Sequence, residues 1–114
     1  MDVEWIRKYC MSLPQATETV QWGSDLVFKI GGKMYAVAAT EPARVFMSFK
    51  CTPEDFAELP ERPGIIPAPY MARAQWVALE SEDVIPAAEL KRLLRRAYEL
   101  VLAKLPKKTQ AAFQ

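Results

Sequence analysis

The sequence predicts an α+β fold in which helices cover one face of an antiparallel sheet. Stretches near both ends of the chain repeat their apolar residues with the period of a helix, whereas the middle alternates apolar and polar residues as strands do. Two of these alternating runs are separated only by Gly31-Gly32, the signal of a tight β-hairpin. We expect an N-terminal helix, about five strands and a long C-terminal helix. A chain of 114 residues forms one domain of this kind with its own core.

The two main helices have recognisable ends. The first is expected over about residues 2–12, because Asp2 is a suitable N-cap and Pro14 stops the apolar repeat. The second, over about residues 86–104, has its leucines on one half and most of its charges on the other, so its apolar half should cover the sheet. Pro106 ends this helix, and we expect the tail beyond it to fray.

The central hairpin should set the register of the sheet. A two-residue diglycine loop calls for a type I′ or II′ turn, since glycine adopts positive φ without steric cost. Counting outward from this loop places Phe28 opposite Tyr35. The residues expected on the core face are Leu26, Phe28, Ile30, Tyr35 and Val37.

Three further strands are expected. Residues 17–22 are β-prone and suit an edge strand, residues 44–50 alternate regularly with Val45, Met47 and Phe49 on one face, and residues 75–80 form another strand. Thr52 caps a short helix after the second of these. Residues 60–70 contain four prolines, so we expect an extended, ordered loop rather than a helix or a central strand.

Composition excludes several function classes. Hydrophobic residues make up 51% and charged residues 25% of the chain, as in ordinary folded proteins. No apolar stretch is long enough for a membrane span, and the acidic start does not resemble a signal peptide, so we expect a cytoplasmic protein with no membrane contact. Without histidine the chain lacks the usual general base, and its two cysteines match no zinc pattern. We expect buried free thiols, no metal, no cofactor and no enzymatic activity.

The net charge of +1 conceals a basic C-terminal part. Residues 1–88 have a formal charge of −4, and residues 89–114 have +5. The exposed half of the long helix carries Lys91, Arg92, Arg95 and Arg96, which are suited to contacting phosphates. The alternative is a solvated helix face that is partly neutralised by pairing of Glu89 with Arg92 and of Arg95 with Glu99.

The sheet face away from the helices is a second candidate surface. Alternation along residues 75–80 directs Trp76 to this face, and the same reasoning adds the residues Trp22, Lys29, Met34, Phe46 and Lys50. Aromatic rings interleaved with lysines would suit stacking and backbone contact with a single-stranded nucleic acid. The alternative is that the loop of residues 60–70, or a second copy of the chain, covers these side chains, because exposed tryptophans would favour aggregation.

Several segments together resemble a known family. They are WG at residues 22–23, VFKIGGKMYA at 27–36, KC at 50–51, PGIIPAPYMAR at 63–73, QWV at 75–77, YELV at 98–101 and LPKK at 105–108. Over nearly its whole length the chain resembles the MmcQ/YjbR family of small bacterial proteins, and this resemblance implies a "double wing" α+β domain with a frataxin-type sheet and DNA binding. Members often carry a histidine just before the tryptophan that corresponds to Trp76. This chain has Gln75 there, so a role of that imidazole does not transfer.

These observations predict a weak, largely sequence-independent DNA-binding protein. Its expected contact residues are Lys29, Lys33, Lys50, Arg73, Trp76, Lys91, Arg92, Arg95 and Arg96. The alternative is a non-enzymatic module that binds a protein partner or itself through the Trp76 face or the loop of residues 60–70.

Overall fold

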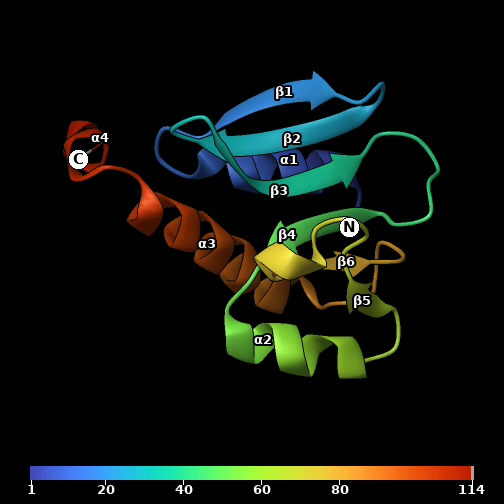
Figure 1. The fold of residues 1–114 in the computed structure, drawn as a ribbon. Helices are drawn as coiled ribbons and strands as arrows, with labels where there is room; N and C mark the ends of the chain where they lie inside the picture. The colour runs from blue at the N-terminus through green and yellow to red at the C-terminus, as the bar shows by residue number, and fades with distance from the viewer. Residues whose placement is uncertain (114) are drawn as a thin grey trace.

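A six-stranded antiparallel sheet forms the centre of the protein, with the strand order β1-β2-β3-β4-β6-β5 (Figure 1). The computed structural model describes residues 1–113. The strands are β1 (Thr17–Gln21), β2 (Asp25–Ile30), β3 (Lys33–Ala39), β4 (Met47–Lys50), β5 (Ile65–Pro67) and β6 (Trp76–Leu79). The helices are α1 (Val3–Ser12), α2 (Pro53–Glu58), α3 (Ala87–Lys104) and α4 (Lys107–Ala112). The predicted α+β class is confirmed, with one strand more than expected.

The main core lies between one face of the sheet and the helices α1 and α3. It includes Ile6 of α1, Phe49 of β4 and Leu94 of α3, all with no exposed surface. The two tyrosines of this core have hydrogen-bonded hydroxyl groups, as buried polar atoms require. The Tyr35 hydroxyl donates to the carbonyl of Cys10 at 3.0 Å, and the Tyr98 hydroxyl donates to the carbonyl of Pro14 at 2.7 Å. Both bonds hold the chain at the end of α1 against the sheet and α3.

The hairpin turn agrees with prediction, but the register beyond it does not. Gly31 and Gly32 have φ angles of 59° and 79°, so the turn is of type I′. Lys29 pairs with Met34, but Phe28 then pairs with Ala36, which leaves Tyr35 as the extra residue of a β-bulge. The predicted pairing of Phe28 with Tyr35 is therefore wrong. Because a one-residue shift reverses the faces, Val37 lies on the opposite face from the one predicted, whereas Tyr35 stays in the core.

The strand β4 is shorter than the predicted strand of residues 44–50. The expected alternation begins only at Met47, which enters the main core together with Phe49. Phe46 also packs against the main core, and Val45 packs on the other face of the sheet. Each residue therefore lies on the face opposite to the one predicted. The reason is that residues 40–46 form the connection from β3, where the period of two does not apply.

The proline-rich segment is more ordered than a loop. It contains a 3₁₀ turn at Leu59–Glu61 and then β5, which pairs with β6 along one edge of the sheet. An edge position accommodates Pro67, because the side of the strand that faces solvent needs no ladder hydrogen bond. A second 3₁₀ turn at Ala72–Ala74 leads into β6. The prediction that this segment is not a central strand is confirmed.

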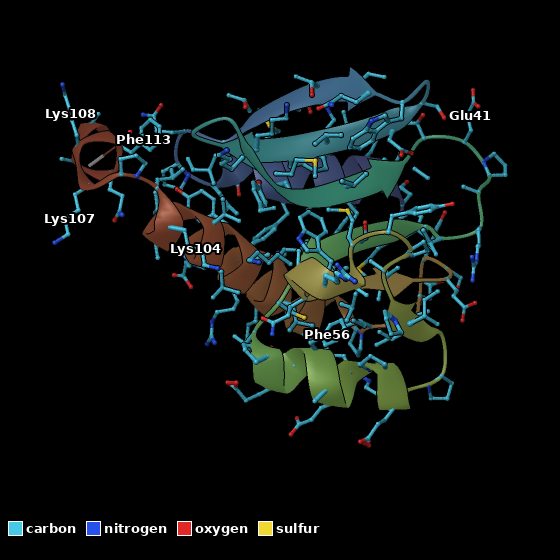
Figure 2. The ribbon with its side chains drawn as sticks, in the orientation of Figure 1. Glu41, Phe56, Lys104, Lys107, Lys108 and Phe113 are labelled. Atoms are coloured by element: carbon cyan, nitrogen blue, oxygen red, sulfur yellow. The ribbon has the colours of Figure 1, made fainter. Side chains whose placement is uncertain are left out.

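The C-terminal tail does not fray over the described residues. After Pro106 the chain forms the short helix α4, and Phe113 packs against the main core. The Gln110 side chain donates to the carbonyl oxygens of Ala103 and Leu105, at 3.3 and 2.7 Å. These bonds satisfy carbonyls that the end of α3 leaves open, and they hold α4 beside it. Lys107 and Lys108 project from different sides of α4 (Figure 2).

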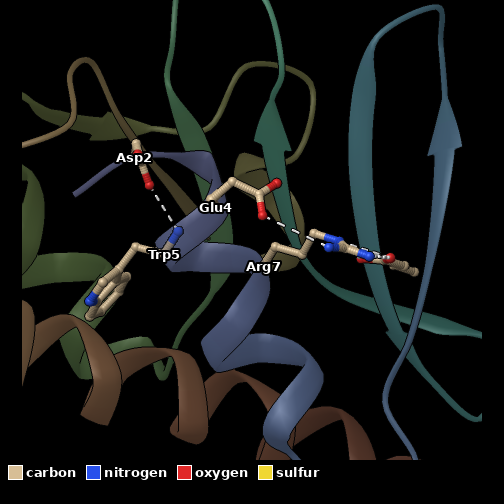
Figure 3. A network of polar contacts seen from close by, with 5 residues as sticks. Asp2, Glu4, Trp5 and Arg7 are labelled. Carbon is tan, nitrogen blue, oxygen red and sulfur yellow. Dashed lines mark hydrogen bonds and ion pairs between the residues drawn. The ribbon is translucent and has the colours of Figure 1, made fainter.

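The start of α1 is fixed by the predicted cap and by an ion-pair network (Figure 3). The Asp2 carboxylate accepts a hydrogen bond from the backbone N–H of Trp5 at 2.9 Å. One turn later, the Arg7 guanidinium donates to Glu18 of β1 at 2.7 to 2.9 Å and lies 3.9 Å from Glu4. A bidentate pair of this type orients α1 along the edge strand.

Candidate functional site

The turn of the β2–β3 hairpin lies directly against the end of α3. A Cβ atom built on Gly31 would come within 2.6 Å of the Leu105 side chain. The exposed side chain of Lys33 follows this turn, and Lys104, Lys107 and Lys108 continue from α3 into α4 at the same end of the molecule (Figure 2). The fold thus brings together lysines that are more than seventy residues apart in sequence.

Lys50 and Arg73 extend this group of cations. Lys50 ends β4, and its Nζ donates to the carbonyl of Ala74 at 2.8 Å, which places it beside the exposed Arg73. Partial burial, with the nearby charge of Lys104, lowers the pKa of Lys50 from its usual value. We call this set the basic end of the sheet. Its members are Lys33, Lys50, Arg73, Lys104, Lys107 and Lys108.

The opposite end of the sheet is acidic. Asp25 begins β2, Glu41 lies in the connection from β3 to β4, and Glu80 follows β6. Because the strands are antiparallel, all three lie away from the hairpin turn, and Figure 2 shows Glu41 on the far side from Lys107 and Lys108. The separation of charge is partial, because Arg44 lies in the same connection as Glu41, and Glu54 and Asp55 begin α2 soon after Lys50. Such a separation orients a molecule toward phosphates even when its net charge is small.

The outer face of α3 does not belong to the basic end, and it is partly neutralised. Arg95 forms the predicted pair with Glu99, at 3.5 Å. The predicted pair of Glu89 with Arg92 is absent, because Glu89 instead forms a bidentate pair with Arg62, at 2.7 and 3.0 Å. The ammonium of Lys91 lies 5.8 Å from the ring of Trp5 and 5.7 Å from that of Tyr9, within cation–π range. Arg92 and Arg96 lie on the same helix and are exposed to solvent.

Trp76 lies on the predicted face of the sheet but is only 3% exposed. It forms a second apolar cluster with Val27, Val37, Ala68 and Ala78, against which Ile66 and Met71 also pack. Part of the proline-rich segment thus covers the tryptophan, as the alternative prediction held. This burial removes Trp76 from any surface on which a base could stack. Lys29 is half-buried on β2, where it pairs with Thr17 of β1.

The uncovered part of the same face contains a groove of about 710 Å³. It crosses β3 and β4 and is lined by Trp22 from the turn between β1 and β2 and by Tyr70 from the segment after β5. Sequence reasoning assigned Trp22 to this face but missed Tyr70 and Arg44, which also line the groove. The only available signal for Tyr70 was its place at the end of the proline-rich segment.

The two cysteines are buried free thiols, as predicted. Burial raises the pKa of Cys10 to about 12 and that of Cys51 to about 11. Both thiols are therefore protonated and unreactive at neutral pH. Within residues 1–113, no three potential metal-binding side chains gather into one site. None of the helices described here has the length and apolar character needed to cross a membrane.

The fold and these surfaces define a small α+β protein with one basic end and an open-face groove. The model of the YjbR family matches residues 11–100, and the chain belongs to this family. The predicted resemblance is thereby confirmed.

Two solved structures share the fold. Deinococcus radiodurans protein DR2400, whose family-model domain is DUF419, is 31% identical, with a TM-score of 0.87 over 98% of this chain and 87% of that one. A protein from Pseudomonas syringae is 22% identical, with a TM-score of 0.72 over 89% of this chain and 99% of that one. No curated protein matches the sequence.

Proposed function

We propose that this YjbR protein binds DNA through the phosphate backbone, weakly and with little sequence preference, and that it has a binding role rather than a catalytic one. The observation that carries the proposal is the presence of six cations at the basic end of the sheet. Phosphate contacts of this kind supply affinity without reading sequence.

The arrangement of charges supports weak binding. With a net charge of only +1, long-range attraction is limited, and we expect a dissociation constant of roughly 10⁻⁴ to 10⁻⁶ M at physiological salt. Lys50 is already bonded to a backbone carbonyl, so the exposed side chains of Lys33, Lys104, Lys107 and Lys108 are the main expected contacts. If about four phosphates are contacted, log K falls with log salt at a slope of about −3.6 on double-stranded DNA.

The test compares two triple variants that remove the same charge. Replacing Lys104, Lys107 and Lys108 by glutamine should weaken binding and flatten the salt slope by about 0.9 for each lost contact, because glutamine keeps helix propensity but not charge. The matched control replaces Arg92, Arg95 and Arg96 by glutamine, and it should bind almost as the parent does. Fluorescence anisotropy with labelled DNA, from low to physiological salt, provides the measurement.

Two outcomes would contradict the proposal. If the parent binds neither single- nor double-stranded DNA at low salt, the protein has no nucleic-acid function of this kind. If the control variant loses as much affinity as the first, the outer face of α3, not the basic end, makes the contacts.

The second candidate function is a protein-interaction or self-association module. The burial of Trp76 weakens the case for an interaction surface at that residue. The full exposure of Tyr70, at the end of the loop of residues 60–70, still favours an interaction module. Absence of DNA binding together with concentration-dependent association in sedimentation experiments would support this alternative.

A further inference from the structure

The groove on the open face of the sheet has the properties of a small-molecule site. Its volume of about 710 Å³ falls within the usual range for ligand pockets. Apolar side chains dominate its lining, and the polar side chains are few, as in most such pockets. The apolar ones include Met34, Val37, Val45 and Met71, and the polar ones are Asp25, Arg44 and Ser48.

Two aromatic residues reach the groove from opposite sides of the sheet. Trp22 follows the edge strand β1, whereas Tyr70 follows β5 at the other edge, yet both line the same groove. Trp22 is 64% exposed and Tyr70 is fully exposed, although aromatic residues of this size are usually buried more deeply. Their exposure leaves the faces of both rings available to a ligand.

Both aromatic residues have a strained backbone. The φ angle is 52° at Trp22 and 66° at Tyr70, in the left-handed region that bulky residues rarely enter. Such a conformation is unfavourable, and it persists only where the surrounding structure imposes it, often at ligand clamps. Gln15 and Gln75 also have positive φ, so this strain is not confined to the groove, but both exposed aromatic residues of the groove have it.

Among the residues that line the groove, Arg44 is a cation that an anionic group on a ligand can face. Arg44 has no ion-pair partner among residues 1–113. Arg44 is exposed, so a complementary anion would gain the modest attraction of a surface ion pair. Asp25 lies on the same groove and can accept a hydrogen bond from a ligand N–H or O–H group.

We propose that this groove binds a planar aromatic small molecule that carries an anionic group, with its ring system between Trp22 and Tyr70 and the anion facing Arg44. This site is distinct from the basic end, and the proposal does not depend on DNA binding.

The test uses two fluorescent probes that differ in charge. 8-Anilinonaphthalene-1-sulfonate has the proposed chemistry, and N-phenyl-1-naphthylamine is its neutral counterpart. Both should bind the folded protein at one saturable site, the sulfonate more tightly. Trp22→Ala and Tyr70→Ala should each weaken both probes by about fivefold or more, as expected for a lost stacking contact. Arg44→Gln should weaken the sulfonate by about threefold and leave the neutral probe unchanged, because it removes one solvent-exposed ion pair.

The controls separate this site from general surface binding. Arg92→Gln removes an exposed arginine outside the groove and should leave both probes unaffected, and thermal melts show that each variant is folded. In the parent protein, NMR shifts caused by the sulfonate should concentrate on the methyl groups of Met34, Val37 and Val45. The proposal is overturned if binding is not saturable, if the aromatic variants bind as the parent does, if Arg44→Gln and Arg92→Gln act alike, or if the NMR shifts lie elsewhere.

Discussion

At the scale of single residues, Tyr35 determines how the central hairpin fits the core. As the extra residue of the bulge, it has no partner on β2, and its side chain turns into the core between Phe28 and Tyr98. Its hydroxyl group reaches the end of α1. A regular hairpin would have placed Val37 in this core and Ala36 on the open face. The bulge therefore decides which side chains form the second apolar cluster under the proline-rich segment.

The two glycines of the turn should respond differently to substitution. Both have positive φ, so Gly31→Ala and Gly32→Ala should each lose roughly 1 kcal/mol of unfolding free energy through backbone strain. Gly31→Ala should lose more, because its Cβ would also meet Leu105, whereas nothing lies within 4 Å of a Cβ at Gly32. Urea unfolding of both variants measures this difference. Equal losses would contradict the tight contact between the turn and the residue after α3.

At the scale of elements, the proline-rich segment covers part of the open sheet face. Ala68 and Met71 pack over Trp76, and the Ala68 N–H donates to the Trp76 carbonyl at 2.9 Å. Beyond this cover the face stays open, and there the groove lies. The same segment thus buries one aromatic residue, Trp76, and presents another, Tyr70, to solvent.

Trp76→Ala should therefore lower the stability of the domain, and its effect should not be limited to ligand affinity. Truncation of a buried aromatic side chain costs about 3 to 5 kcal/mol, and we expect a loss of this size in urea or thermal unfolding. Tyr70→Ala is the matched control, because it removes an exposed ring from the same segment and should change stability by less than about 0.5 kcal/mol. A small effect of Trp76→Ala would mean that the segment does not cover the sheet in solution.

At the scale of the whole molecule, the two ends of the sheet differ in charge while the interior is uncharged. No charged or other polar residue is buried among residues 1–113, and the ionisable groups of the core are thiols and tyrosine hydroxyls. Burial raises the pKa of Cys10 to about 12, and it also raises the pKa of Tyr35. The interior is therefore neutral at physiological pH, and electrostatic function is confined to the surface.

This distribution predicts a loss of stability in alkaline solution. A thiol that titrates near pH 9 when unfolded but near pH 12 when folded keeps its proton longer in the folded state. Its contribution is fully present below pH 9 and declines as the pH rises toward 12, because only the unfolded state releases the proton. For Cys10 the decline should reach about 2 kcal/mol at pH 10.5.

Urea unfolding at pH 8 and pH 10.5 measures this effect. Cys10→Ala removes the thiol, so its stability should fall less than that of the parent over the same interval. A parallel decline in both proteins would show that other groups cause the alkaline loss.

The sequence by itself determined the local structure. Asp2 and Thr52 cap helices through their own side chains, the diglycine requires a type I′ or II′ turn, and the leucine stripe of α3 has one apolar side to bury. Each of these follows from residues within a few positions of one another. The basic character of residues 89–114 was equally visible, because it is a matter of composition.

Only the tertiary structure decided which distant residues meet. The bulge at Tyr35 has no signature in its own strand, since it depends on how β2, β3 and α1 pack together. The pairing of Glu89 with Arg62 in place of Arg92 depends in the same way on the contact between the proline-rich segment and the start of α3. Alternation along the strand placed Trp76 on the correct face of the sheet, but it could not show what covers this side chain. Trp22 and Tyr70, which line one groove, are almost half the chain apart in the sequence. The basic end and the groove are both sites of this kind. The groove is built from strands and loops, whereas the basic end joins strand ends to the helices α3 and α4, and in both cases the residues become neighbours only when the chain folds.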